Sequence, residues 1–124
     1  IINENELRHE MRDKSGNLEK LGLQLINHLK INKLIITRGD KGAMLIEKKG
    51  KTIYAPAFAN KVVDKVGAGD TMLAVTSLCM KIKMPNDLAL FLGSLAGASA
   101  VESIGNSKFI NKEQLVRQIQ FSIK

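Results

Sequence analysis

Two glycines flank one alanine in Gly67-Ala68-Gly69, and an acid and a hydroxyl residue follow in Asp70-Thr71. Glycine lets the backbone approach a ligand closely, because no side chain stands in the way. The apolar pattern beginning near Ala68 predicts a helix, whose N-terminal amides and dipole would attract phosphate. A carboxylate there repels a bound anion, unless it takes a proton from an attacking hydroxyl group. The alternative, which these residues leave open, is that Asp70 and Thr71 only cap the helix.

The elements that would position this stretch follow from the spacing of apolar residues. We expect helices at residues 3 to about 13, 18–30, 68–83, 86 to about 103 and 111 to about 122. Either Asn3 or Asn5 would cap the first helix. We expect extended segments at residues 1–2, 34–37 and 62–63, and an antiparallel hairpin that pairs residues 43–47 with 51–55.

Three of these segments carry expectations about packing. The run Leu34-Ile35-Ile36-Thr37 suits a buried parallel strand with helices on both faces. The helix at 68–83 is apolar on most sides and should be largely buried, with Cys79 as a small core residue. The helix after Pro85 is rich in small residues from Gly93 to Ala100. Those residues would allow either tight helix packing or the close approach of a flat ligand.

Composition limits the classes of function. The formal charge of +7 is concentrated between Lys30 and Lys65, where nine basic and three acidic side chains give +6. Such a surface attracts polyanions. The five aromatic residues do not cluster with the lysines, however, which argues against a binding site for single-stranded nucleic acid. We interpret the charge as a solvated face near a nucleotide site. The lack of an export signal or a spanning segment, and the single cysteine, favour a cytoplasmic location.

Three motifs, taken together, resemble the C-terminal portion of the ribokinase-like (PfkB) carbohydrate kinases. Residues 64–71 look like the family signature Asp-Thr-x-Gly-Ala-Gly-Asp-Thr, with Lys65 in place of the usual Thr. Asn3-Glu4-Asn5-Glu6 fits the Asn-x-x-Glu motif, and residues 37–42 fit the Thr-x-Gly-x-x-Gly nucleotide turn. The small-residue helix and the turn Gly105-Asn106-Ser107 are most similar to bacterial heptose-phosphate kinases.

The resemblance implies a fold and its extent. The fold would be α/β, part of a three-layer α/β/α arrangement with a mostly parallel sheet and an antiparallel edge hairpin. Residues 1–124 would be the nucleotide-binding and catalytic portion, and the sugar-binding part would precede Ile1. The apolar start of the chain, without Met, also suggests a fragment of a longer protein.

The resemblance also implies a role for each motif. Asp70 would be the general base toward a sugar hydroxyl, and Gly67-Ala68-Gly69 would form the anion hole for the transferred phosphoryl group. Asn3 and Glu6 would organise Mg²⁺ and its waters. The residues implied to contact the nucleotide are Thr37, Arg38, Gly39, Asp40, Lys41, Gly42, Ser94 and Ala98. Those implied to hold a monovalent cation are Asp64, Val66, Ala100, Ser103 and Gly105.

The implied cofactors are ATP and Mg²⁺, with K⁺ as a third candidate. Lys65 would bring an ammonium group beside the cation site, so we expect a weak K⁺ requirement. Ser94 stands where many members of the family carry Asn near the adenine. The expected partners are ATP and a sugar or sugar phosphate, together with a second copy or the remainder of the parent chain. No specific nucleic acid and no membrane is expected.

Two alternatives remain beside the kinase. The first is a non-catalytic nucleotide-binding or regulatory module of the same fold, which would have no use for the acid at Asp70. The second is a basic nucleic-acid-binding domain, which the charge alone supports. A dinucleotide site is disfavoured, because Gly67-Ala68-Gly69 lacks the third glycine of that fingerprint.

Overall fold

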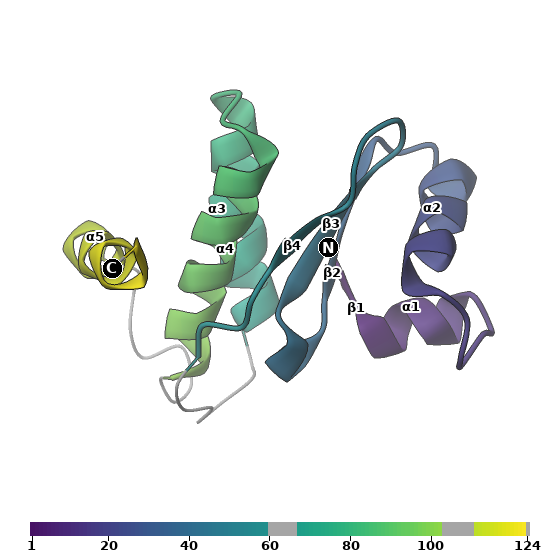
Figure 1. The fold of residues 1–124 in the computed structure, drawn as a ribbon, viewed down its shortest axis with the longest axis horizontal. Coiled ribbons are helices and arrows are strands. Elements are labelled where there is room, and N and C mark those ends of the chain that lie inside the picture. The colour runs from purple at the N-terminus through teal and green to yellow at the C-terminus, as the bar shows by residue number, and fades with distance from the viewer. Residues whose placement is uncertain (60–66, 103–110, 124) are drawn as a thin grey trace. The chain divides into compact units, whose positions relative to one another are not determined.

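The computed structural model describes residues 1–59, 67–102 and 111–123 (Figure 1). The chain divides into two compact units, Ile1–Pro56 and Ala57–Lys124. The first unit combines a small sheet with two helices, and the described part of the second is built from helices. In the described ranges no helix is both long and apolar enough to cross a bilayer. The expected extended segment at 62–63 and the turn at 105–107 lie outside the described residues.

The described residues of the first unit form a sheet in the order β1-β2-β3-β4. These strands are β1 (Ile2–Asn3), β2 (Lys33–Thr37), β3 (Ala43–Glu47) and β4 (Ile53–Ala55). β1 and β2 are parallel, whereas β2 with β3 and β3 with β4 are antiparallel. The predicted hairpin is therefore confirmed.

The prediction of a mostly parallel sheet is wrong for the described strands. The strand expected to be parallel, at residues 34–37, pairs in parallel with β1 on one side and antiparallel with β3 on the other. The reason lies in the connections. Short turns join β2 to β3 and β3 to β4, and a short turn can join only antiparallel neighbours. A parallel pair needs a longer crossover, which two helices supply between β1 and β2 (Figure 1).

Those two helices are α1 (Glu4–Glu10) and α2 (Leu18–Leu29). Asn3, not Asn5, caps α1, and Asn17 caps α2 by accepting a hydrogen bond from the Lys20 amide. α1 ends at Glu10, earlier than expected, because the chain then turns through Arg12 in the left-handed region, at φ 52°.

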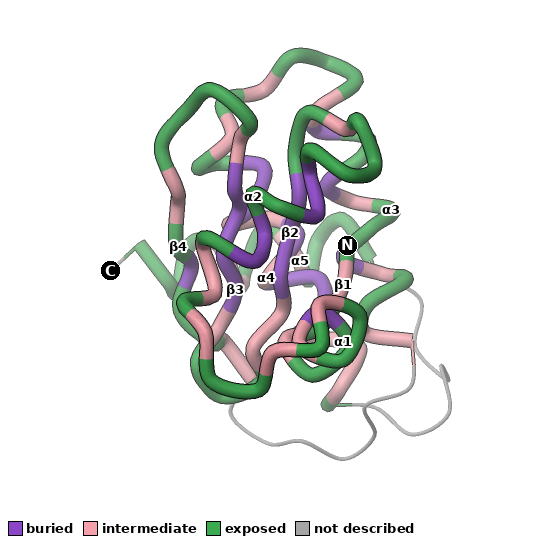
Figure 2. Tube along the Cα trace, turned by 90° about the vertical axis from the view of Figure 1, so that its right-hand side faces the viewer, coloured by how far each residue is buried: buried purple, intermediate pink, exposed green. Residues whose placement is uncertain are grey.

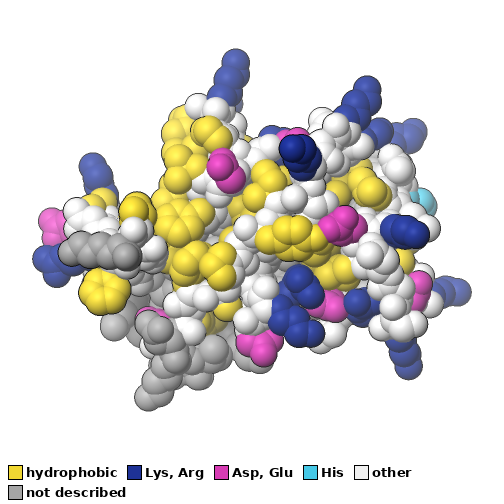
Figure 3. Space-filling model, viewed as in Figure 1, with side chains coloured by type: hydrophobic (Ala, Val, Ile, Leu, Met, Phe, Trp, Pro, Cys, Tyr) yellow, Lys and Arg dark blue, Asp and Glu magenta, His cyan; other side chains and the backbone are white. Residues whose placement is uncertain are grey.

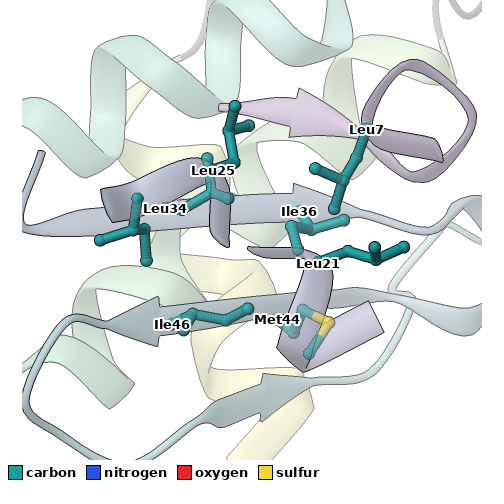
Figure 4. Close-up of a cluster of buried hydrophobic side chains, with 8 residues drawn as sticks. Leu7, Leu21, Leu25, Leu34, Ile36, Met44 and Ile46 are labelled. Atoms are coloured by element: carbon teal, nitrogen blue, oxygen red, sulfur yellow. The ribbon is translucent and has the colours of Figure 1, made fainter. Parts of the chain in front are cut away.

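The core of the first unit lies between the helices and one face of the sheet (Figures 2 and 4). Its buried members are Leu7, Leu21, Leu25, Ile26, Leu34, Ile36, Met44 and Ile46. Leu34 and Ile36 alternate with Ile35, which is also buried, so the expected burial of β2 is confirmed. Helix α2 lies close to the sheet at Gly22, where an added Cβ would fall 2.4 Å from Ile46 Cδ1.

The second unit contains α3 (Ala68–Lys81), α4 (Asn86–Val101) and α5 (Lys112–Ile123). Glycines let α3 and α4 approach closely. A Cβ added at Gly93 would lie 2.2 Å from Thr76 Cγ2, and one added at Gly97 would lie 3.3 Å from the Ala68 carbonyl oxygen. Tight helix packing, one of the two expectations for the small-residue helix, is therefore confirmed at these glycines.

The expectation that the helix at 68–83 is largely buried is wrong. Only Met72, Thr76 and Cys79 are buried along α3, whereas Leu78 is 69% exposed. Among the described residues α3 packs mainly against α4. One packed neighbour covers one face of an α-helix and leaves the opposite face open, however apolar that face is. Cys79 is a core residue as expected, and burial raises the pKa of its thiol.

We predict that Gly93→Ala lowers the free energy of unfolding by about 1–3 kcal/mol, because the new methyl group overlaps Thr76 Cγ2. Thr76 cannot simply rotate away, since its Oγ1 donates a hydrogen bond to the Met72 carbonyl oxygen at 2.7 Å. The double variant Gly93→Ala/Thr76→Ser removes Cγ2 and keeps the hydroxyl, so it should recover most of the loss. Urea denaturation measures both, and equal losses in the single and double variants would contradict this account of the contact.

Candidate functional site

Parallel pairing of β1 with β2 brings two of the sequence motifs together. Asn3 is the last residue of β1, Thr37 is the last residue of β2, and the two are register partners. The Asn-x-x-Glu motif and the Thr37–Gly42 turn therefore begin side by side at the carboxyl edge of this pair. Ligands of α/β proteins commonly bind beyond that edge.

The Thr37–Gly42 turn depends on its two glycines. Gly39 has φ 61° and Gly42 has φ 82°, in the left-handed region that side chains disfavour. The Arg38 amide donates a hydrogen bond to the Gly42 carbonyl oxygen at 2.8 Å, which closes the turn. No atom lies within 4 Å of a Cβ built at Gly39, and Asp40 and Lys41 are exposed, so the turn is open to a ligand.

Asn3 and Glu6 form a reciprocal cap at the start of α1. Asn3 Oδ1 accepts a hydrogen bond from the Glu6 amide at 2.8 Å, and Glu6 Oε2 accepts one from the Asn3 amide at 2.9 Å. Both residues are exposed, and Glu6 Oε1 has no hydrogen-bond partner among the described residues. Mg²⁺ often keeps several waters and binds through one or two carboxylates plus phosphate oxygens. One open carboxylate oxygen fits such a water-mediated role.

A denser metal site is not found. In the part of the chain that the structure describes, no group of three or more His, Cys, Asp or Glu side chains could hold a metal ion. Of the implied monovalent-cation ligands, Asp64, Val66, Ser103 and Gly105 lie outside the described residues, and Ala100 lies in α4. The cation site therefore remains a prediction.

Glu4 links the two motifs, although the sequence did not single it out. Its Oε2 accepts a hydrogen bond from Arg38 Nε at 3.3 Å, and its Oε1 lies 2.9 Å from Arg8 Nη2. Partial burial raises the pKa of Glu4, but the hydrogen bonds and charges of the two arginines outweigh it, so the pKa is lowered. Glu4 is therefore ionised at neutral pH. The spacing of Glu4 and Arg8 could have indicated their pair, but not the contact with Arg38.

The N-terminus of α3 has the form of an anion site. Gly67, at φ 85°, is the N-cap residue and has no capping side chain. The Thr71 amide donates to the Gly67 carbonyl oxygen at 2.9 Å, and the amides of residues 68–70 have no acceptor among the described residues. Gly69 and Asp70 are exposed.

Asp70 stands beside these amides with its carboxylate unengaged. It makes no hydrogen bond or ion pair with any residue in the described ranges. The capping role that the sequence left open for Asp70 is therefore not seen. An exposed, unpaired carboxylate next to free amides can accept a proton from a hydroxyl group held there.

A hollow of about 300 Å³ lies between α4 and α5, and its lining includes Ala98, one of the residues implied to contact the nucleotide. It is lined by Phe58, Leu95, Ala98, Glu102, Arg117, Gln118, Phe121 and Ser122. One turn before Ala98, Ser94 Oγ is buried without a hydrogen-bond partner among the described residues. The contribution of α5 was missed, because its amphipathic pattern does not show which helix it covers.

The basic residues divide between two ends of the sheet. Arg38 and Lys41 lie in the turn after β2, whereas Lys33 begins β2 and Lys48 and Lys49 follow β3. Figure 3 shows Lys and Arg side chains, in dark blue, at several separate places on the face that it draws. A five-residue strand separates the two ends by about 13 Å. Lys33, Lys48 and Lys49 therefore lie at the end of the sheet away from the Thr37–Gly42 turn. The interpretation of the basic stretch as a solvated face near a nucleotide site stays a prediction.

Comparison with known proteins gives a consistent result. A family model described as pfkB family carbohydrate kinase matches residues 1–113. "Bifunctional protein HldE" of Haemophilus ducreyi is 32% identical over 98 residues, which are 79% of this chain and 20% of the relative. The protein of the same name from Methylococcus capsulatus is 30% identical, with the same coverage. The chain thus spans about one fifth of the length of these relatives.

Solved structures share the fold. A ribokinase from Thermotoga maritima matches with a TM-score of 0.81 at 24% identity, over 95% of this chain and 40% of its own. Ribokinase of Arabidopsis thaliana, solved with ribose and ATP, has a TM-score of 0.82 at 23% identity, and the match covers 97% of this chain and 41% of the ribokinase chain. Phosphofructokinase-2 of Escherichia coli, solved with potassium, has a TM-score of 0.82 at 18% identity, and the match covers 98% of this chain and 40% of the phosphofructokinase chain.

These likenesses agree with the motifs in the sequence. The three motifs that carry the resemblance all lie within the matched residues 1–113. The described residues also have the α/β fold of the solved kinases. The chain therefore belongs to the pfkB family of carbohydrate kinases.

Proposed function

We propose that this chain is the nucleotide-binding and catalytic portion of an ATP-dependent kinase that phosphorylates a hydroxyl group of a sugar or sugar phosphate. The observation that carries the proposal is the N-terminus of α3. There the amides of residues 68–70 have no acceptor among the described residues, and the exposed Asp70 carboxylate stands unpaired beside them. Among the described residues, no hydrogen bond or ion pair accounts for an acid in that position.

Asp70 takes the proton of the acceptor hydroxyl group while the hydroxyl oxygen attacks the γ-phosphorus of ATP. The new O–P bond forms while the bond from the γ-phosphorus to the β,γ-bridging oxygen breaks, and ADP leaves with that electron pair. The open amides of residues 68–70, at the Gly67-Ala68-Gly69 stretch, stabilise the charge on the transferred group. Phosphoryl transfer needs mainly positioning and neutralised charge, which a helix N-terminus and one base can provide.

The residues at the carboxyl edge of β1 and β2 bind the remaining phosphates. The open turn at Gly39–Lys41 approaches them with its backbone, and Arg38 supplies positive charge. Mg²⁺ would neutralise charge on the phosphate oxygens when bound. Asn3 fixes the start of α1, and Glu6, whose Oε1 is open, would hold water near such an ion.

The hollow between α4 and α5 receives the adenine. Its apolar lining, including Ala98 and Phe121, suits a flat aromatic ring, and Arg117 and Gln118 supply polar groups. The buried and unpartnered Ser94 Oγ would gain a hydrogen-bond partner if a polar edge of the base reached it. The Arabidopsis ribokinase of the same fold was solved with ribose and ATP, which supports a nucleotide in this family.

The acceptor is proposed to be a heptose phosphate, on the resemblance of the small-residue helix and the 105–107 turn. The residues that select it would lie outside this chain, which spans about 40% of the solved kinases. We further propose a cytoplasmic location and a three-layer arrangement in the complete protein. K⁺ dependence would be weak because of Lys65, although phosphofructokinase-2 was solved with potassium.

The second candidate is a non-catalytic nucleotide-binding module of this fold. The capping box at Asn3 and the closed turn at Gly42 would serve such a module equally well. The unpaired Asp70 favours the kinase, since ATP binding alone gains nothing from an acid beside phosphate.

We predict that Asp70→Asn in the complete protein lowers kcat by about 10²- to 10⁴-fold and leaves the Kd of ATP nearly unchanged, because only proton transfer is lost. Steady-state kinetics and calorimetry measure the two quantities. Asp87→Asn is the matched control, since Asp87 is also an exposed acid in the first turn of a helix. A loss of less than tenfold for Asp70→Asn would overturn its role as the base.

We predict that Gly69→Val lowers kcat without unfolding the protein. Loss of one amide contact would raise the activation free energy by about 3–4 kcal/mol. A Cβ at Gly69 meets no atom within 4 Å, so the change affects only the approach of phosphate. Gly67→Val should lower both kcat and the unfolding free energy, because φ at Gly67 is 85°. Thermal unfolding separates the two variants, and normal activity of Gly69→Val would refute the anion site.

A further inference from the structure

We propose that Glu4 is a positioning residue of the nucleotide site, whose carboxylate holds the Arg38 guanidinium ready for the phosphates of the nucleotide. The inference rests on the proposed function, because Arg38 needs a phosphate ligand for its orientation to matter. Glu4 itself would touch neither the nucleotide nor the sugar.

Both carboxylate oxygens of Glu4 are engaged with arginines. Oε2 accepts from Arg38 Nε at 3.3 Å, and Oε1 accepts from Arg8 Nε at 3.0 Å and lies 2.9 Å from Arg8 Nη2. The three side chains are 21–26% exposed, so they are partly shielded from water. A carboxylate bound on both sides keeps one orientation.

Arg8 fixes this arrangement from the side away from the turn. Its Nη1 donates a hydrogen bond to the Gly16 carbonyl oxygen at 3.0 Å, in the loop between α1 and α2. Gly16 in turn donates its amide to Asp13 Oδ1 at 2.7 Å. These hydrogen bonds connect Glu4 to the loop between α1 and α2. At the other end of the same series of contacts stands Arg38, which belongs to the Thr37–Gly42 turn.

Arg38 is held in a way that leaves its phosphate-binding groups open. Glu4 contacts Nε, whereas Nη1 and Nη2 have no hydrogen-bond partner among the residues that the structure describes. The two terminal amino groups of a guanidinium match two phosphate oxygens in a planar fork. Because Glu4 fixes the plane of this fork, less side-chain entropy is lost when a phosphate binds.

The direction in which ATP affinity changes when Glu4 is removed distinguishes a positioning role from a purely electrostatic one. A carboxylate near bound phosphate repels it, so removing Glu4 should tighten ATP binding if Glu4 acts only through its charge. If Glu4 orients Arg38, removing it should weaken binding instead. If the ion pair has only a structural role on the surface, it contributes little to stability, and removing Glu4 would leave the affinity for ATP almost unchanged.

The experiment measures the Kd of Mg-ATP and of adenosine by calorimetry in the complete natural protein that contains these residues. The variants are Glu4→Ala, Arg38→Ala and the double variant. Glu10→Ala is the control, because it removes an equal charge from an exposed acid on the same helix. We expect Glu4→Ala to weaken ATP binding roughly five- to tenfold, without effect on adenosine.

In the Arg38→Ala background, adding Glu4→Ala should change the Kd of ATP less than twofold, since Glu4 acts through Arg38. Unchanged or tighter ATP binding by Glu4→Ala, equal weakening of ATP and adenosine, or additive effects in the double variant would each overturn the positioning role. A wild-type protein that binds no Mg-ATP would instead overturn the proposed function itself.

Discussion

Left-handed backbone at three glycines shapes both groups of candidate site residues. Gly39 and Gly42 turn the chain sharply after β2, and Gly67 starts α3 without a capping side chain. Other residues adopt these φ values only at a cost of about 1–2 kcal/mol each. The result in both places is backbone that a ligand can approach. This is what phosphate recognition by amides requires, and it explains why the glycines stand where they do.

The acids around these turns divide into two kinds. Glu4 has both oxygens bound by arginines, and Glu6 uses one oxygen to cap α1, so structure accounts for most of their bonding. Asp70 has no partner among the described residues. Paired carboxylates place other groups, whereas an unpaired one beside free amides is available for proton transfer. This contrast, more than any single distance, supports the assignment of roles.

The sequence predicted what depends on neighbouring residues. The bounds of α2, β2 and β3 follow from local apolar spacing, and Asn3 and Asn17 are caps of a familiar kind. It did not predict what depends on distant residues. The described sheet is mostly antiparallel because its turns are short. Helix α3 is half exposed because, among the described residues, it packs mainly against α4. The contact of Glu4 with Arg38 spans 34 positions, and no local pattern encodes it.

The proposed chemistry depends most on the N-terminus of α3, whose amides would bind the phosphoryl group that is transferred. A crystal structure of the complete protein with Mg²⁺ and a non-hydrolysable ATP analogue tests this most directly. We expect the γ-phosphate within hydrogen-bond distance, about 3 Å, of the amides of residues 68–70. A bound nucleotide whose γ-phosphate contacts none of these amides would contradict the proposal.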